Sequence, residues 1–110
     1  VVISDAMMAA GLDEGEYTLG GQRVIKTDAA RLADGTLAGS ATNLFEEFQN
    51  LLEFGIDFRS ALKACTANPA KAIGVFDVTG SIEPGKRADL TVIDGDAQLR
   101  HVFIKGKQVL

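Results

Sequence analysis

The spacing of hydrophobic and polar residues changes along this chain, and each change indicates a different element. The stretch from Val1 to Ser4 is apolar on both faces rather than alternating, which predicts a short, fully buried strand that ends at Asp5. From Tyr17 to Gly35 the pattern predicts a pair or a trio of short strands, because Gly20-Gly21 and Asp34-Gly35 are turn signals.

Helical spacing follows between Thr42 and Phe54, where the apolar residues share one face and the acidic and amide residues face away. Gly55 supplies the stop signal for this helix. Ser40, Thr42 or Asn43 can serve as its N-cap, and the spacing of Asn43 and Glu46 is that of a capping box. The predicted apolar face consists of Leu44, Phe45, Phe48, Leu51 and Leu52.

Two further helices are predicted before the character of the chain changes. The first begins at Asp57. The second begins at Asn68-Pro69, with the asparagine as cap and the proline at the first helical position, and it ends at Gly74. The residues that the first of these helices is expected to turn inward are Ala61, Leu62, Ala64 and Cys65.

Strand and turn patterns fill the rest of the chain. One strand is predicted at Leu90 to Ile93 and a second at Leu99 to Ile104, and a very short third strand follows near the C-terminus. We therefore place a boundary near Gly74. It separates a mixed α/β part, residues 1–74, from an all-β part, residues 75–110.

Length and composition allow one small domain or part of a larger one. The 110 residues are 46% apolar and 24% charged, which is ordinary for a soluble protein with a packed core. No apolar run approaches the roughly 18 residues of a membrane helix, and no secretory signal is visible. The chain begins without an initiator methionine, which predicts a processed or truncated chain. Cys65 is the single cysteine, so we expect a reducing, cytoplasmic location.

The charge distribution disfavours two classes of partner. The net charge is −4, the basic residues are scattered, and the chain has one tyrosine and no tryptophan. A nucleic-acid-binding surface gathers basic residues and often interleaves them with aromatic ones. We therefore expect no nucleic-acid partner and no anionic membrane surface as partner.

Asp5 is the first candidate for chemistry. At the carboxyl end of a strand in a parallel α/β sheet or barrel, a carboxylate can bind a metal or move protons. An aspartate after a strand also commonly caps the backbone N–H groups of the following loop. On spacing alone, the capping role is the more frequent of the two.

The loop Leu37-Ala38-Gly39-Ser40 is the second candidate, because its small side chains let a ligand approach the backbone ahead of a helix. It can equally be a tight loop that needs Gly39 for its backbone angles. His101 is the only histidine and has no cysteine partner at ligand spacing, so we expect no metal site within this chain. Cys65 is expected to fill space in the core.

Taken together, several motifs resemble those of the amidohydrolase superfamily. "SDAM", "GTLAGS", "NPAKAIG" and "GSIEPGKRADLTVID" occur in the order seen in that superfamily, and the pattern G-x-x-x-x-G-K-x-A-D-L is widespread within it. "YTLGG" followed by "ARLADGTLAGS" is similar to the narrower family of N-acetylglucosamine-6-phosphate deacetylases. The resemblance runs through the whole chain.

The resemblance implies a metal-dependent (β/α)8 barrel with a small β-sandwich, of which this chain would be the C-terminal part. Val1 to Ser4 would be the last barrel strand, the helices through Gly74 the closing segment of the barrel, and Val75 onward the C-terminal strands of the sandwich. Most of a complete barrel would then be missing from these residues.

The resemblance also implies roles for site residues. Asp5 would be the catalytic aspartate that takes a proton from metal-bound water and returns it to the departing amine, and Leu37, Ala38 and Gly39 would contact the sugar. The substrate would be N-acetylglucosamine 6-phosphate, and the intact enzyme a homodimer. The ligands of the divalent metal, zinc or a similar ion, would lie outside this chain, so the chain alone is expected to be inactive.

Other readings stay open at this point. One is a binding module that keeps the sugar-contacting loop without catalysis, and another is a structural role for the all-β part. Within the enzyme class, a related amidohydrolase acting on another N-acyl compound is the alternative.

Overall fold

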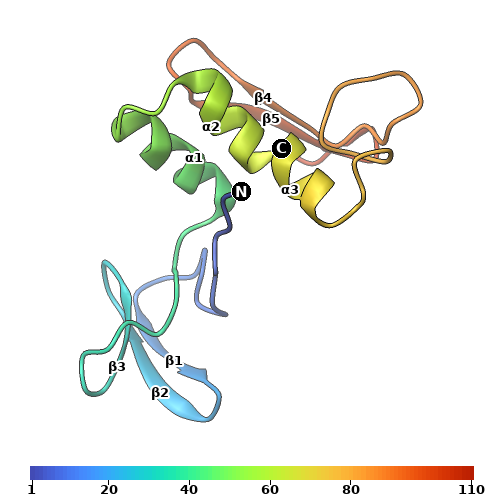
Figure 1. The fold of residues 1–110 in the computed structure, drawn as a ribbon. Coiled ribbons are helices and arrows are strands. Elements are labelled where there is room, and N and C mark those ends of the chain that lie inside the picture. The colour runs from blue at the N-terminus through green and yellow to red at the C-terminus, as the bar shows by residue number, and fades with distance from the viewer. The chain divides into compact units, whose positions relative to one another are not determined.

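The computed structural model describes all 110 residues, and contacts between them divide the chain into two compact units. Residues Val2–Asn50 form one unit, and Leu51–Leu110 together with Val1 form the other. Each unit has its own three-stranded sheet (Figure 1). The division falls inside a helix, and the boundary near Gly74 between the mixed α/β part and the all-β part stays a prediction.

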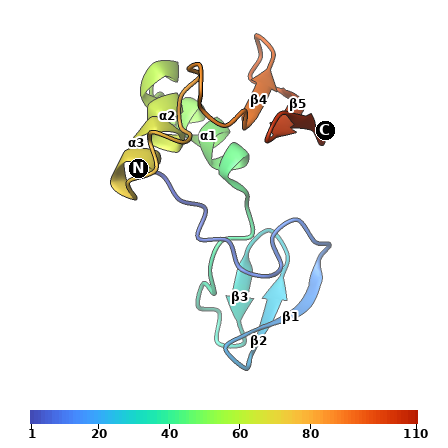
Figure 2. The same ribbon diagram turned by 90° about the vertical axis from the view of Figure 1, so that its right-hand side faces the viewer.

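The first unit is built on an antiparallel sheet, as the turn signals predicted. Its strands are β1 (Gly15–Leu19), β2 (Gln22–Lys26) and β3 (Ala30–Leu32), and they lie side by side in that order (Figure 1, Figure 2). Gly20 and Gly21 join β1 to β2 with φ angles of +57° and +80°. Two successive positive φ angles match the right-handed twist of a tight hairpin, which is why two glycines stand there.

Val24 lies at the centre of the core of this unit. Its side chain is fully buried, and the neighbouring buried side chains are small apart from Met7. Lys26 ties the preceding segment to the sheet, since its Nζ donates to the carbonyl of Ala9 at 3.0 Å. The buried cluster consists of Met7, Ala9, Val24, Ala30 and Ala38, with Tyr17, Leu32 and Ala41 packed against it.

The predicted strand at Val1 to Ser4 is wrong for this structure. These residues form no strand, and Val1 and Ile3 are 65% and 71% exposed. A strand needs a neighbour to pair with its backbone groups, and no other strand lies alongside these residues. The first β-type backbone pairing after these residues is an isolated parallel bridge between Ala6 and Ser40.

Helix α1 spans Leu44–Glu53, within the predicted helical region. Of the predicted N-caps, Asn43 serves, because its Oδ1 accepts from the backbone N–H of Phe45 at 2.9 Å and of Glu46 at 3.0 Å. Glu46 completes the predicted capping box by accepting from the N–H of Asn43 at 3.0 Å. At the other end, Gly55 has a φ angle of +83°, which allows the chain to leave the helix.

Helices α2 (Phe58–Cys65) and α3 (Ala67–Ala72) follow. Asp57 caps α2 as predicted, accepting from the N–H of Ser60 at 3.1 Å, but Leu62 is 41% exposed rather than turned inward. The predicted start of α3 is also wrong. Thr66 precedes its first residue, so Pro69 stands third in the helix, where a backbone N–H would have no helical partner anyway.

The second sheet has the predicted strands at the predicted bounds. Its order is β4 (Leu90–Ile93), β5 (Leu99–Ile104) and β6 (Lys107–Gln108), all antiparallel. Asp94 closes the turn between β4 and β5, because its Oδ1 accepts from the backbone N–H of Gln98 at 2.9 Å. This bond, followed by that with the Arg100 guanidinium, lowers the pKa of the Asp94 carboxyl.

The segment between α3 and β4 carries the widespread amidohydrolase-like pattern, and it packs closely on its surroundings. Gly80 lies so near α3 that a Cβ on it would stand 2.6 Å from the Cβ of Ala70. Lys86 is 10% exposed at its side chain, with Nζ 2.6 Å from Ser81 Oγ and 3.6 Å from the centre of the Phe76 ring. These residues hold the segment in place, so the pattern has a structural explanation.

None of the helices α1, α2 and α3 has both the length and the apolar composition of a membrane-spanning helix.

Candidate functional site

Asp5 has a left-handed backbone conformation and is bonded through its backbone to a distant segment. Its φ angle is +48°, a left-handed value that is uncommon for a residue with a side chain, and the residue is exposed. Its carbonyl accepts from the N–H of Ser40 at 3.0 Å, and the N–H of Met7 donates to the carbonyl of Ser40 at 2.9 Å. Two backbone bonds therefore clamp the chain on either side of Ala6.

The loop before α1 is bonded on both sides. On one side Ser40 pairs with the Asp5 to Met7 segment, as just described. On the other side the N–H of Ala38 donates to the carbonyl of Ala30 at 2.9 Å, at the edge formed by β3. The two candidate site segments, far apart in the sequence, thus lie next to each other, joined backbone to backbone.

Gly39 is required where the loop meets Asp5. Its φ angle is +125°, and a Cβ on it would stand 3.4 Å from the carbonyl oxygen of Asp5 and 3.5 Å from the Cβ of Met7. A side chain would be strained at this φ angle, while its Cβ would make ordinary van der Waals contacts with the segment that carries Asp5. Of the two interpretations of this loop, the structure supports the one in which the loop needs Gly39 for its backbone angles.

The three loop residues differ in what they can offer a ligand. Leu37 is 62% exposed, so its side chain is available for an apolar contact. Ala38 is 8% exposed and belongs to the core cluster with Met7 and Val24. Any contact made by Ala38 or Gly39 is therefore a backbone contact.

Ser40, the last residue of this loop, belongs to a connected set of three polar residues that was not recognised from the sequence. Ser40 Oγ lies 2.5 Å from Thr42 Oγ1, which in turn donates to a carboxylate oxygen of Glu47 on α1. The only available signal was that Ser40 and Thr42 competed with Asn43 as N-caps. Since Asn43 caps the helix, the two hydroxyls are left for another task.

The described residues contain no cluster suited to a metal ion. No group of three or more histidine, cysteine, aspartate or glutamate side chains gathers anywhere in the chain. His101 lies on β5 in the second unit, exposed, with its Nδ1 3.2 Å from Gln108 Nε2. A metal ion in a protein takes several such ligands, so Asp5 alone does not fit a metal site.

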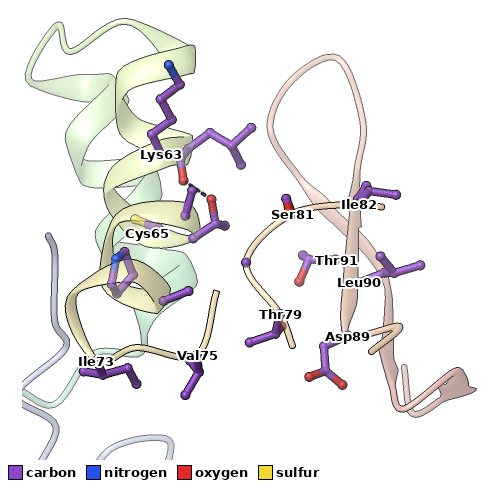
Figure 3. Close-up of a pocket in the computed structure, with 16 residues that line it drawn as sticks. Lys63, Cys65, Ile73, Val75, Thr79, Ser81, Ile82, Asp89, Leu90 and Thr91 are labelled. Carbon is purple, nitrogen blue, oxygen red and sulfur yellow. Dashed lines mark hydrogen bonds between the residues drawn. The ribbon is translucent and has the colours of Figure 1, made fainter. Parts of the chain in front are cut away.

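The second unit has a hollow of about 600 Å³ beside α2, α3 and β4. Figure 3 shows Cys65 and Ile73 on its helical side and Thr79, Asp89 and Thr91 on the side facing them. The Asp89 carboxylate is already engaged, because it accepts from the Lys105 N–H at 2.9 Å and pairs with Arg87. The bond from the Lys105 N–H and, after it, the bond with Arg87 lower the pKa of the Asp89 carboxyl.

Comparisons with known proteins agree with one another. The profile of the Amidohydrolase family matches residues 8–109. The chain is 37% identical to an N-acetylgalactosamine-6-phosphate deacetylase of Escherichia coli, over 97% of this chain and 29% of that protein. It is 36% identical to the N-acetylglucosamine-6-phosphate deacetylase of Bacillus subtilis, over 96% of this chain and 27% of that protein.

The chain is also similar to a solved structure of a deacetylase. The crystal structure of the N-acetylglucosamine-6-phosphate deacetylase of Pasteurella multocida superposes with a TM-score of 0.89 at 36% identity, covering 96% of this chain and 28% of that one. The chain spans 29% and 27% of the length of the two curated relatives named above, so it corresponds to less than a third of each.

Proposed function

Because this chain belongs to the amidohydrolase family, we propose that it forms part of a deacetylase of N-acetylglucosamine 6-phosphate in which Asp5 is the catalytic residue. The observation that carries the proposal is the contact between the two candidate segments. The carbonyl of Asp5 accepts from Ser40, directly after the loop Leu37-Ala38-Gly39. This backbone bond brings the residue that carries the candidate carboxylate next to the small-residue loop expected to contact the sugar.

The reaction assigns a proton transfer to each half of the cycle. Water attacks the carbonyl carbon of the acetamide while the Asp5 carboxylate takes one of its protons. The carbon–nitrogen bond of the resulting tetrahedral species then breaks, and Asp5 returns the proton to the departing amine. The products are acetate and the amino sugar phosphate, and Asp5 ends in its starting state. The exposure of Asp5 is consistent with a group that must reach water and substrate.

The loop would hold the sugar in two ways. Leu37 offers an exposed apolar side chain, while Ala38 and Gly39 offer backbone at close range. Gly39 has the additional task of allowing the loop to touch the Asp5 segment without strain. Substrate placement and the position of the catalytic carboxylate are therefore coupled through this residue.

The amidohydrolase family is generally metal-dependent. The residues of this chain do not fit a metal site, so we propose that ligands for a divalent ion lie on parts of the protein outside residues 1–110. The (β/α)8 barrel with its β-sandwich, the homodimer and the cytoplasmic location of the intact enzyme stay predictions that follow from the same family resemblance.

N-acetylgalactosamine 6-phosphate is a second candidate substrate. The relatives include an N-acetylgalactosamine-6-phosphate deacetylase at 37% identity beside an N-acetylglucosamine-6-phosphate deacetylase at 36%. The two sugars differ only in the orientation of the hydroxyl at carbon 4. Nothing in the loop Leu37-Ala38-Gly39, which offers one apolar side chain and backbone, chooses between them.

The test is acetate release by the complete gene product. N-acetylglucosamine 6-phosphate, N-acetylgalactosamine 6-phosphate and unphosphorylated N-acetylglucosamine are compared at equal concentrations. We expect release from at least one of the two phosphorylated sugars, at a kcat/KM well above that of the unphosphorylated sugar. Saturable binding of the phosphorylated sugars without acetate release would favour a non-catalytic binding module and overturn the proposal.

A further inference from the structure

The loop that meets Asp5 is anchored to α1 by a chain of side-chain hydrogen bonds. Thr42 Oγ1 donates to Oε1 of Glu47, and Ser40 Oγ lies 2.5 Å from the same Thr42 oxygen. The backbone N–H of Thr42 donates to Ser40 Oγ at 3.0 Å. Asn50, one turn further along α1, donates from Nδ2 to the other carboxylate oxygen of Glu47 at 3.5 Å.

The donor of each of these side-chain hydrogen bonds follows from the number of hydroxyl protons available. A threonine hydroxyl has one proton, and that of Thr42 goes to Glu47. The short contact between the two hydroxyls is then made by the proton of Ser40, which points to Thr42. Ser40 Oγ uses its single proton there and accepts from the Thr42 N–H, so its side chain is fixed in one orientation.

Ser40 connects these side-chain hydrogen bonds to the Asp5 segment through its own backbone. Its N–H donates to the carbonyl of Asp5 at 3.0 Å, and its carbonyl accepts from Met7 at 2.9 Å. Asp5 has a left-handed φ of +48°, a value that aspartate adopts more readily than most residues with a side chain but that is still uncommon. The two bonds with Ser40 hold the backbone on either side of Ala6 in this arrangement.

We propose that Glu47 is a positioning residue for Asp5, acting through Thr42 and Ser40. This inference rests on the proposed function, since it assigns a role toward the catalytic carboxylate. All three members of the anchor are half-buried. The neighbouring Glu46 makes a contrast: it is exposed, and its carboxylate is used in the capping box with Asn43.

The main test measures kcat and KM in the complete gene product. Glu47→Ala removes the acceptor of the Thr42 proton, and we expect kcat to fall tenfold to a hundredfold, since small displacements of a catalytic group have effects of that order. Glu47→Gln keeps an oxygen that can accept from Thr42, so it should retain kcat within about threefold of the wild-type value. An equal loss in both variants would overturn the proposal.

The matched control is Glu46→Ala, which removes the same charge from the same turn of α1 but breaks only the capping box. Its kcat should stay within about twofold of the wild-type value. If Glu46→Ala lowers kcat as much as Glu47→Ala, the effect comes from the stability of α1 and the positioning role is wrong.

A double-mutant cycle tests whether the residues act as one chain. Thr42→Val removes the hydroxyl and keeps the side-chain shape, so it should lower kcat about as much as Glu47→Ala. The double variant Thr42→Val/Glu47→Ala should show no further loss, because both changes break the same connection. Additive losses would overturn the proposal.

Amide hydrogen exchange separates a failure of this inference from a failure of the proposed function. The N–H groups of Ser40 and Met7 are the donors that clamp the Asp5 segment. Their exchange should be at least tenfold faster in Glu47→Ala than in Glu46→Ala, whatever the substrate of the enzyme is. Unchanged exchange at both amides would overturn the positioning role even in an active deacetylase.

Discussion

Replacing Gly80 by alanine tests how the segment between α3 and β4 is held. The new Cβ would stand 2.6 Å from the Cβ of Ala70, 3.3 Å from the carbonyl oxygen of Thr66 and 3.4 Å from a ring carbon of Phe76. Nonbonded carbons normally keep about 3.5 to 4 Å. The segment or α3 must therefore move by roughly 1 Å to admit one methyl group.

The expected loss of stability has two parts. Gly80 has a φ angle of +96°, and a residue with a side chain pays about 1 to 2 kcal/mol in that region. Overpacking a close contact adds about 1 to 3 kcal/mol. The sum, about 2 to 5 kcal/mol, is a large share of the 5 to 15 kcal/mol by which a domain is usually stable.

The matched control is Gly85→Ala. Gly85 has a similar φ angle of +89°, but its Cβ would meet no atom within 4 Å. It therefore measures the conformational part alone, about 1 to 2 kcal/mol. The assay is urea unfolding of the complete gene product followed by circular dichroism, with all variants compared at one temperature and pH.

A compensating change completes the design. Ala70→Gly removes the methyl group that the new Cβ would meet, at a cost of about 1 kcal/mol for glycine within a helix. In the double variant Gly80→Ala/Ala70→Gly, the loss should be smaller than the sum of the two single losses. Equal losses for Gly80→Ala and Gly85→Ala, or strict additivity in the cycle, would refute the packing argument.

Three further predictions follow from the contacts described above. Gly39→Ala should lower kcat/KM for the phosphorylated sugar about tenfold or more, because its φ angle of +125° strains the loop backbone where it contacts Asp5. Gly35→Ala, which also has a positive φ angle but whose Cβ would meet no atom within 4 Å, should stay within about twofold, and steady-state kinetics compare the two variants. Asn43→Ala should lower the free energy of unfolding by about 1 kcal/mol through loss of the α1 cap, measured by urea unfolding. The pKa of Asp89 is lowered in the folded state, so its contribution to stability is present above its ordinary value of 3.8 and is lost as the pH falls through the folded-state value. Urea unfolding across pH 2 to 7 should therefore show Asp89→Asn and the wild type converging in acid, and a constant gap would contradict this.

Local patterns predicted the second sheet well. Strands β4 and β5 have the predicted bounds because the information that forms them is local: two β-rich runs flank a short turn in which Asp94 bonds the backbone. The capping box of Asn43 and Glu46 was likewise readable, since it depends on spacing alone.

Features that depend on distant partners were not predictable in the same way. Val1 to Ser4 have the composition of a strand, but a strand forms only where a neighbour supplies paired backbone groups. The start of α3 was misplaced because Thr66 alone separates α3 from α2, and its hydroxyl donates to the carbonyl of Leu62 in α2. Propensity alone does not reveal such a bond.

The candidate site was readable only in part. Residue types singled out Asp5 and the loop Leu37-Ala38-Gly39, and the family resemblance implied that they face one pocket. The backbone bonds make the two segments neighbours, and the roles of these residues stay predictions. The anchor that joins Ser40 to Glu47 through Thr42 was invisible, because two hydroxyls and a carboxylate meet only through the turn geometry that precedes α1.

The most direct test of the account is the effect of Asp5→Asn on acetate release by the complete gene product. The amide keeps the shape of the carboxylate but does not take up a proton, so kcat for the preferred N-acetylated sugar phosphate should fall about a hundredfold to ten-thousandfold. Binding of the same sugar phosphate, measured by titration calorimetry, should stay within about threefold. A variant that still releases acetate within tenfold of the wild-type rate would contradict the assignment of Asp5 as the catalytic residue.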